Sequence, residues 1–452
     1  MRTRFTWIVA VVALLSIGFL VACSAKYSAS VNGLIVVPTQ ANKVMETFSL
    51  DLANGGVAQI YNQNGPPTGG IPGSVILDPA GAFSYVIINQ NPGEQPSSTG
   101  IMSFPIASDG KLGSGTITAM NPTSPTVNAP CVTKTGATVP AAVQPTPVAP
   151  VAMAIDSAGK FMFVADAATS GQTQPYTCNG SSTTATVAVP GTVSVFSLSN
   201  GALTEIAGSP FALPIEPDGQ TASASALAVT PTTYPNEYAV CAQQTAITTE
   251  NLYVTDSVNY VVMNFSIDMS TGTPTLVPTA TTPAVATGTD PSGVAVDPCN
   301  RFVYVANSQP SNTVSAYTIC STVSPTQDCP QADFSLHPVP GSPYPVGDAP
   351  GPLSVDAYGN FLYVVDTGSS QISAFRISDS TGALATLATP TYSIGSVAGA
   401  NSIAIRSDDS FLFVANGNAQ TVSEFGIVPA SGSLTAEAPI STYNYPSGVA
   451  VK

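Results

Sequence analysis

Short runs of β-branched and aromatic residues alternate along the chain with clusters of Gly, Asp, Asn and Pro. One unit of this pattern joins Val294–Asp297, Arg301–Asn307 and Thr313–Tyr317. Apolar runs of this length, bounded by residues that favour turns, predict β-strands joined by tight connections. The pattern therefore predicts an all-β protein.

The same unit recurs along the chain. Clear copies cover Leu353–Phe375 and Ile403–Phe425, and degraded copies begin near Val75, Val151 and Ala226. In several copies a further strand follows a Gly-x-Leu turn, at Gly201, Gly382 and Gly432. Four strands in roughly 45–50 residues match the size of a β-propeller blade.

The two ends of the repeat complement each other. The first unit, which starts at Leu34–Val37, lacks its innermost strand, and Ser447–Lys452 has the pattern of that strand. If the last strand completes the first blade, the sheets close into a ring without a free edge. The alternative, an open solenoid, would not need its last fragment to complement its first. We therefore predict a seven-bladed β-propeller of four-stranded antiparallel blades over residues 33–452.

Two of the runs carry a resemblance to a known family. Phe302–Asn307 and Leu252–Asp256 resemble the YVTN-type repeats of the lactonase-like seven-bladed propellers. That family includes a bacterial 6-phosphogluconolactonase and the fungal muconate-lactonising enzymes. The resemblance covers nearly all of the chain after its first residues. It implies the fold strongly and the activity weakly, because the shared motif is the blade itself.

The first residues predict export. Residues 1–22 combine a basic start with an apolar run, and Leu20–Cys23 resembles the lipobox of bacterial lipoproteins. We expect 1–22 to be a signal peptide, Cys23 to be lipidated and 23–32 to be a tether. The alternative is a transmembrane anchor, because the apolar run approaches spanning length. Ser24, where an Asp would favour inner-membrane retention, favours the outer membrane or cell surface within the cell envelope.

The amino-acid composition limits the classes of binding partner to expect. Charged residues make up 8% of the chain, and 37 Gly and 40 Pro accompany a hydrophobic fraction of 44%, which is enough for a large core. The formal net charge is −15, which disfavours binding to nucleic acid because phosphate backbones would be repelled. We expect a monomer that contacts the membrane through its lipid and needs no cofactor.

Six cysteines remain after Cys23, an even number in an oxidising compartment. In the resembling propellers the innermost strand runs from the top face to the bottom face, which places each cysteine on one face. This placement predicts three disulfides, each within one face and between neighbouring segments. The expected pairs are Cys131 with Cys178, Cys241 with Cys299, and Cys320 with Cys329. A metal site is not expected, because no Cys-x-x-Cys spacing or histidine partner is present.

A polar residue closes the second strand of almost every unit. These candidate binding residues are Asn89, Asp166, Asp256, Asn307, Asp366 and Asn416. Ringing the top of the channel, they would hold a cation or orient a small polar ligand. The alternative is that they stabilise turns through nearby hydrogen bonds, the role also expected for Asp156, Asp297 and Asp356 at the bottom turns.

Two long insertions, 123–150 and 167–190, interrupt the third unit. We expect them to crowd the top face, where they would form a cap or a recognition surface. Tolerated loop growth is the alternative.

Catalytic residues are not recognisable. His337, the only histidine, falls in an outermost strand, and Arg301, Arg376 and Arg406 map to bottom ends of strands. The resembling enzymes are expected to use His, Arg and Glu near the channel, and no residue matches that set. We therefore expect an envelope module that binds a protein, glycan or small polar ligand on its top face without catalysis. The alternative is a lactonase of the resembling family that uses the top of the channel.

Overall fold

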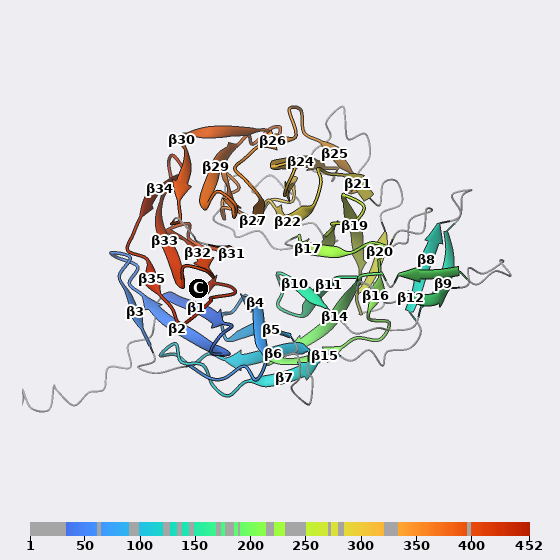
Figure 1. Ribbon diagram of the computed structural model, residues 1–452, viewed down its shortest axis with the longest axis horizontal. Helices are drawn as coiled ribbons and strands as arrows, with labels where there is room; N and C mark the ends of the chain where they lie inside the picture. Colours follow the sequence, from blue (N-terminus) through green and yellow to red (C-terminus); the bar gives the residue numbers. More distant parts are fainter. Residues whose placement is uncertain are drawn as a thin grey trace, which may run out of the picture.

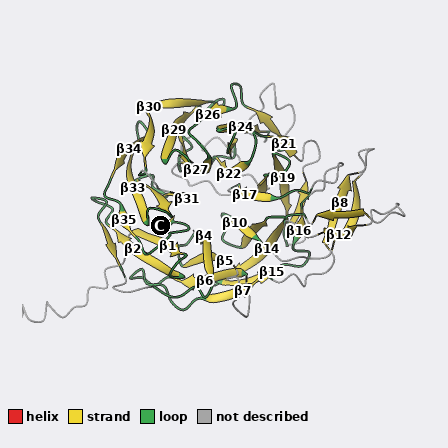
Figure 2. Cartoon of the chain, in the orientation of Figure 1, coloured by secondary structure: helices red, strands yellow, loops and turns green. Residues whose placement is uncertain are grey.

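The computed structural model describes residues 33–60, 65–89, 99–120, 127–132, 138–143, 149–168, 173–176, 185–188, 190–213, 221–230, 250–269, 273–278, 284–320, 333–395 and 399–452. Every regular element in these ranges is a strand (Figure 2). Within them, no helix has the length and hydropathy needed to cross a bilayer. The predicted signal peptide and tether, 1–22 and 23–32, lie outside the described residues.

Seven antiparallel sheets surround a central opening, and in each the strands are ordered from the centre outward (Figure 1). Blade one contains β36 (Ala450–Val451), β1 (Gly33–Thr39), β2 (Val44–Leu50) and β3 (Val57–Gln59). Blade two contains β4 (Ile71–Leu77), β5 (Phe83–Asn89), β6 (Gly100–Pro105) and β7 (Thr116–Ala119). Blade three contains β10 (Pro150–Ile155), β11 (Phe161–Asp166), β14 (Thr192–Ser199) and β15 (Ala202–Glu205), with β16 (Phe211–Ala212) also on β14.

The other four blades repeat this order. Blade four contains β17 (Ala224–Val229), β18 (Glu250–Asp256), β19 (Val261–Asp268) and β20 (Thr275–Pro278), with β21 (Ala284–Ala286) on β19. Blade five contains β22 (Pro291–Val296), β23 (Phe302–Asn307), β24 (Thr313–Ile319) and β25 (Leu336–Pro338), with β26 (Tyr344–Pro345) on β24. Blade six contains β27 (Pro350–Val355), β28 (Phe361–Asp366), β29 (Gln371–Ile377) and β30 (Leu384–Ser393). Blade seven contains β31 (Ala400–Ile405), β32 (Phe411–Asn416), β33 (Thr421–Val428) and β34 (Ser433–Ala436), with β35 (Ile440–Ser441) on β33.

The ring closes as the sequence predicts. In blade one, β36 pairs with β1 through Ile35 opposite Val451 and Val36 opposite Ala450. The last strand of the chain is therefore the innermost strand of the first blade. The prediction of seven four-stranded blades with this closure is confirmed.

The second strand of each blade forms the interior of its sheet. All six residues of β23, β28 and β32 are buried. A strand with blades against both faces needs apolar residues on both, so these strands are continuous hydrophobic runs rather than alternating ones. This is why the Phe-x-Tyr/Phe-Val-x-Asp/Asn pattern of the repeat is so uniform.

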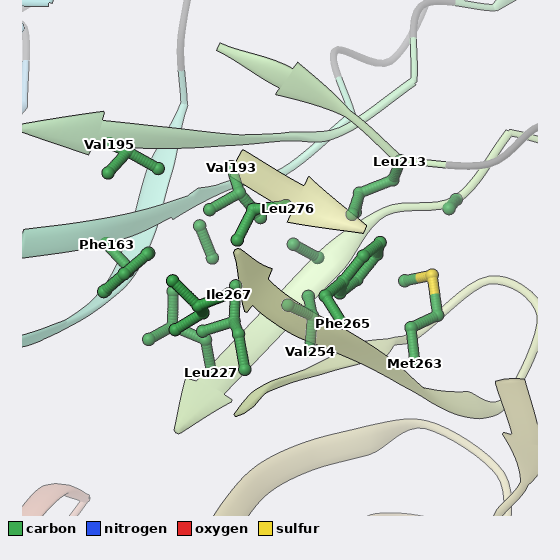
Figure 3. Close-up of a cluster of buried hydrophobic side chains, with 14 residues drawn as sticks. Phe163, Val193, Val195, Leu213, Leu227, Val254, Met263, Phe265, Ile267 and Leu276 are labelled. Carbon is green, nitrogen blue, oxygen red and sulfur yellow. The ribbon is translucent and has the colours of Figure 1, made fainter. Parts of the chain in front are cut away.

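The core lies between the blades. Among the described residues, seven clusters of buried side chains occur, one at each interface between neighbouring blades. Figure 3 shows the cluster between blades three and four, where Phe163 and Val195 face Leu227, Val254 and Ile267. Each blade is therefore stabilised by burial against both of its neighbours.

The Gly-x-Leu turn of the repeat is an inter-blade contact. Gly432 of blade seven has a φ of 71° and its Cα packs against the ring of Phe361 in blade six. Gly382 lies against Phe302 in the same way, one blade earlier. Only glycine combines a positive φ with this close approach at low cost.

At the bottom face, an aspartate caps the turn after the innermost strand. Oδ1 of Asp156 accepts the backbone N–H groups of Lys160 and Phe161 at 2.6 and 2.7 Å. Asp297 and Asp356 accept the equivalent backbone groups in blades five and six. These hydrogen bonds are the structural role that the sequence predicts for the bottom-turn aspartates.

The two insertions of blade three contain additional hairpins. β8 (Val127–Val132) pairs with β9 (Thr138–Val143), and β12 (Thr173–Tyr176) pairs with β13 (Ala185–Ala188). In Figure 1 the hairpins lie beyond the rim of the ring, beside β16, and not over the central opening. The expectation that these insertions crowd the top face is therefore wrong for their described strands.

Candidate functional site

The central opening is a channel of about 610 Å³. The innermost strands or adjoining residues of all seven blades line it. Each innermost strand pairs with a neighbour on one side only, so backbone N–H and C=O groups of its free edge face the channel. Such a wall offers hydrogen bonds to a polar ligand from many directions.

Polar side chains tie the innermost segments together, blade to blade. Each donates to a backbone carbonyl of the next blade near the top of the channel. The four bonds are Ser225 Oγ to Pro291 O (2.5 Å), Ser292 Oγ to Pro350 O (2.7 Å), Asn401 Nδ2 to Pro446 O (2.9 Å) and Ser447 Oγ to Gly73 O (2.9 Å). We call these four residues the polar belt. The belt fixes the spacing of neighbouring innermost strands and so the width of the channel.

The register of the innermost strands shifts beside the belt. In blade five the shift falls between Pro291 and Gly293, and in blade seven between Ala400 and Ser402. Blades two, three, four and six show it at the equivalent place. A bulge redirects the side chain that it carries. In this ring it turns the belt residue toward the neighbouring blade.

Two ionisable side chains occur among the described residues that line the channel, Asp78 and Lys452. Both lie at the bottom end, where Asp78 follows β4 and Lys452 follows β36. Oδ1 of Asp78 accepts the backbone N–H of Phe83 at 2.7 Å, and Nζ of Lys452 donates to the carbonyl of Gly81 at 3.3 Å. The channel therefore combines neutral hydrogen-bonding groups with one carboxylate and one ammonium.

The six predicted binding residues do not line this channel. Each stays in its own blade, and five of them are almost fully buried: Asp166, Asp256, Asn307, Asp366 and Asn416. Asn89 is half-buried at the end of β5.

In four blades the partner of this residue is a serine of the third strand. The pairs are Asp166 Oδ2 with Ser194 Oγ (2.9 Å), Asn307 Nδ2 with Ser315 Oγ (3.0 Å), Asp366 Oδ2 with Ser373 Oγ (2.7 Å) and Asn416 Nδ2 with Ser423 Oγ (2.8 Å). In blade four, Asp256 Oδ1 instead accepts the backbone N–H groups of Ser223 and Val258, each at 2.9 Å. The structure thus uses these polar groups to join strands and turns inside a blade.

Burial raises the pKa of two of these aspartates. Loss of solvation raises the pKa of Asp166 to about 7, against the lowering effect of hydrogen bonds from Ser194 and Thr192. Burial likewise raises the pKa of Asp366 to about 6, although Ser373 donates to it. Neither carboxyl contacts the channel.

The histidine and the three arginines are not among the residues that line the channel. His337 is in β25, the outermost strand of blade five, with Nε2 3.2 Å from Ser335 Oγ. Arg301 forms a buried ion pair with Asp297 at 2.8 Å, and Arg376 lies 4.9 Å from the centre of the Phe361 ring. Nε of Arg406 donates to the carbonyl of Lys452 at 3.2 Å.

Of the six cysteines predicted to pair, Cys131 lies in β8, and Cys299 and Cys320 lie in blade five. Cys299 and Cys320 are fully buried and their sulfur atoms are disulfide-bonded. Cys178, Cys241 and Cys329 lie outside the described residues, so the pairing remains a prediction. Within the described ranges no group of three or more His, Cys, Asp or Glu residues is arranged to hold a metal ion.

Sequence reasoning missed the polar belt and the two ionisable channel residues. A signal for the belt was present, because Pro291–Gly293 and Pro446–Gly448 share the tripeptide Pro-Ser-Gly. Its serine stands at the bulge that faces the next blade. Asp78 was hidden because it has the same place in the repeat as Asp156, a turn cap.

Comparison with known proteins supports the family. Residues 342–452, which span blade six, blade seven and the closing strand, match the model of the family described as lactonase, 7-bladed β-propeller. No curated protein sequence matches the chain.

Solved structures share the fold over almost the whole chain. A periplasmic gluconolactonase of Pseudomonas aeruginosa is 15% identical, with a TM-score of 0.62, covering 93% of this chain and 98% of its own. A putative 6-phosphogluconolactonase of Bacteroides fragilis is 16% identical, with a TM-score of 0.60, covering 95% and 100%. A putative 6-phosphogluconolactonase of Bacteroides uniformis is also 16% identical, with a TM-score of 0.57, covering 93% and 99%.

These findings correct one expectation. The preference for a non-catalytic binding module rested on the missing His, Arg and Glu set, and the family match together with the solved lactonases favours the alternative instead. A residue set expected from distant enzymes is a weak reason to exclude catalysis at this level of identity. This chain is therefore a seven-bladed β-propeller closed by its last strand, and its residues 342–452 match the lactonase propeller family.

Proposed function

We propose that this protein hydrolyses lactones in its central channel. The observation that carries the proposal is the match of residues 342–452 to the lactonase propeller family. The channel supports it, because its volume of about 610 Å³ falls within the usual range of small-molecule sites. In the reaction, water adds to the lactone carbonyl, the ring C–O bond breaks, and a hydroxy acid leaves.

The lining supports a polyhydroxylated substrate. The free edges of the innermost strands offer hydrogen bonds to several hydroxyl groups at once. A phosphate would need cations, and Lys452 is the one cationic side chain among the described lining residues. The net charge of −15 also repels anions. We therefore assign an unphosphorylated sugar lactone as the substrate class.

Asp78 is our candidate general base. Its carboxylate is the proton acceptor among the ionisable groups of the described lining. One of its oxygens caps the turn through the N–H of Phe83, which would hold the group in place.

The test is hydrolysis of D-glucono-1,5-lactone and its 6-phosphate by purified protein, beside Asp78→Asn and Asp156→Asn. Asp156 caps the equivalent turn of blade three and does not line the channel, so its variant controls for lost capping. We expect turnover of the unphosphorylated lactone, a loss of about 100-fold or more in Asp78→Asn, and near-normal rates in Asp156→Asn. No turnover of either lactone by folded protein contradicts the proposed function. Preference for the phosphorylated lactone contradicts the substrate class.

We also propose that the protein is a lipid-anchored envelope protein, because Leu20–Cys23 resembles a lipobox. In a bacterial host, incorporation of a palmitate label that is lost in Cys23→Ala would support the anchor. Labelling that persists in this variant contradicts it.

The disulfide pairs Cys131–Cys178, Cys241–Cys299 and Cys320–Cys329 are part of the same proposal. Two of the six sulfurs, those of Cys299 and Cys320, are bonded, which supports an oxidising compartment. Peptide mapping without reduction tests the pairs, and a peptide linking Cys131 to Cys299 would contradict them.

A further inference from the structure

Blade seven differs from the two blades before it in a residue pair that faces blade one. In blades five and six, a tyrosine of the second strand lies opposite a small residue, as Tyr304 lies opposite Ala316 and Tyr363 opposite Ala374. In blade seven the corresponding pair is Phe413 and Glu424. Blade seven therefore lacks the tyrosine hydroxyl and has a carboxyl group where blades five and six have alanine.

In blades five and six the tyrosine hydroxyl has a defined partner. It donates to the carbonyl of the outer-turn glycine in the next blade, Tyr304 to Gly382 at 3.0 Å and Tyr363 to Gly432 at 2.8 Å. Phe413 cannot make this bond. Gly55 of blade one, which packs against Phe411, takes the corresponding turn position.

Glu424 is buried and incompletely bonded. Glu424 is 2% exposed, and its Oε1 atom has no hydrogen-bond partner. A buried carboxyl oxygen without a donor costs free energy. Burial, together with the nearby Glu437 carboxylate, raises the pKa of Glu424 to about 7. The repeat does not require an acid at this position, because blades five and six carry Ala316 and Ala374 there and blade four carries Asn264.

A cleft of about 440 Å³ opens beside this carboxyl group. We call it the seam cleft, because blades seven and one, the last and first of the chain, form its two walls. Its acidic groups are Glu424 and Glu437, and the described lining contains no basic side chain. Its other residues are amides, small residues and the apolar Phe48, Val57, Pro439 and Ile440.

These features specify a ligand class. Two carboxyl groups without a basic partner favour a cation, and a cleft of this volume is far larger than a metal ion. The apolar walls suit a short aliphatic stem, as buried Lys side chains pack their methylenes while their ammonium is bonded. We propose that the seam cleft binds a primary alkylammonium group, with Glu424 as its buried acceptor and Glu437 at the entrance. The site is separate from the channel.

Calorimetric titration of the purified protein tests the proposal with two probes. One is 1,5-diaminopentane, a free amine, and the other is N-acetyl-lysine methylamide, which presents the same group as a protein side chain. Stronger binding of the first would assign the site to free amines, and stronger binding of the second to a lysine of a partner. The neutral 1,5-pentanediol controls for burial of the stem.

Three variants locate the site. Glu424→Gln should weaken binding at least 10-fold and Glu437→Gln several-fold. Glu424→Ala places in blade seven the residue that blades five and six carry, so it should fold and also lose binding. Glu46→Gln is the matched control, because Glu46 is equally buried at the same interface, bonds the backbone N–H of Tyr443 and does not line the cleft.

Saturable binding of an amine that Glu424→Gln abolishes and Glu46→Gln leaves intact is the expected result. Absence of saturable binding by either amine would overturn the proposal. Equal binding of pentanediol, or unchanged binding in Glu424→Gln, would also overturn it. Lactone hydrolysis measured on the same samples stays independent of these outcomes.

Discussion

The hydroxyl of Tyr363 in blade six donates a 2.8 Å hydrogen bond to the backbone carbonyl of Gly432 in blade seven. The tyrosine is fully buried, and burial raises its pKa well above the usual value, so the phenol remains a donor. The bond crosses an interface that also buries a cluster of apolar side chains. It fixes the outer turn of one blade against the second strand of the blade before it.

Removing this bond should destabilise the ring. Tyr363→Phe leaves the Gly432 carbonyl unpaired and is expected to cost about 1 kcal/mol. Tyr253→Phe is the control, because the buried hydroxyl of Tyr253 has no hydrogen-bond partner, and its loss should be neutral or slightly stabilising. Urea unfolding followed by circular dichroism would measure both. Equal losses in the two variants would contradict the role of the inter-blade bond.

The turn glycine that accepts this bond should be hard to replace. Gly432 and Gly69 both have a φ of 71°. A Cβ at Gly432 would overlap the Phe361 ring, whereas nothing lies within 4 Å of a Cβ at Gly69. Gly69→Ala is expected to cost about 1 kcal/mol for the positive φ, and Gly432→Ala a further 1–3 kcal/mol or so for overpacking. Thermal midpoints compare the two, and a smaller loss at Gly432 would refute the packing argument.

Buried aspartates should make the stability pH-dependent. The pKa of Asp166 is raised to about 7 in the folded protein from an ordinary value of 3.8. The folded state therefore holds a proton that the unfolded state releases. The stability that this bound proton contributes is fully present below about pH 4 and is lost as the pH rises toward 7.

Asp166→Asn should remove this dependence, so the variant should gain stability relative to wild type between pH 4 and 8. Asn416 occupies the same place in blade seven, and Asn416→Asp should create the opposite change. Unfolding free energies across this range measure the difference. A constant difference between Asp166→Asn and wild type would show that the carboxyl does not titrate in the window.

Closure depends on the last strand. Deleting residues 447–452 removes β36, exposes the inner edge of β1 and breaks the belt bond from Ser447 to Gly73. We expect a large loss of thermal stability and self-association through the exposed edge. Light scattering and circular dichroism would measure both effects. Recovery on adding a peptide of residues 444–452 would tie them to the missing strand, and a deletion variant that stays monomeric and stable would contradict the closure argument.

The repeat made the fold predictable, because every blade needs the same buried second strand and the same turn residues. Phe302, Phe361 and Phe411 recur for one reason, their contact with the glycine of the next blade. The direction in which each side chain points was harder to predict from the sequence. Asp166 and Asp366 close a strand near the top face, but they point to serines of the third strand, and the recurring Thr-x-Ser of 192–194 and 421–423 was the available signal.

The candidate sites were harder to predict than the fold. Asp78 shares its repeat position with turn caps, so pattern alone gives it no distinct role. Glu424 is visible only when blades are aligned and its counterparts Ala316 and Ala374 are compared. The hairpins at 127–143 and 173–188 belong to no repeat, so no recurring contact indicated their direction.

One buried cluster at each of the seven interfaces has a consequence for unfolding. A linear array of repeats has two terminal units with one uncovered face each, and these units fray first. In the closed ring no blade is terminal. Local opening must break an intact interface, so the slowest-exchanging amides should be spread over the second strands of all seven blades rather than concentrated in the middle of the sequence.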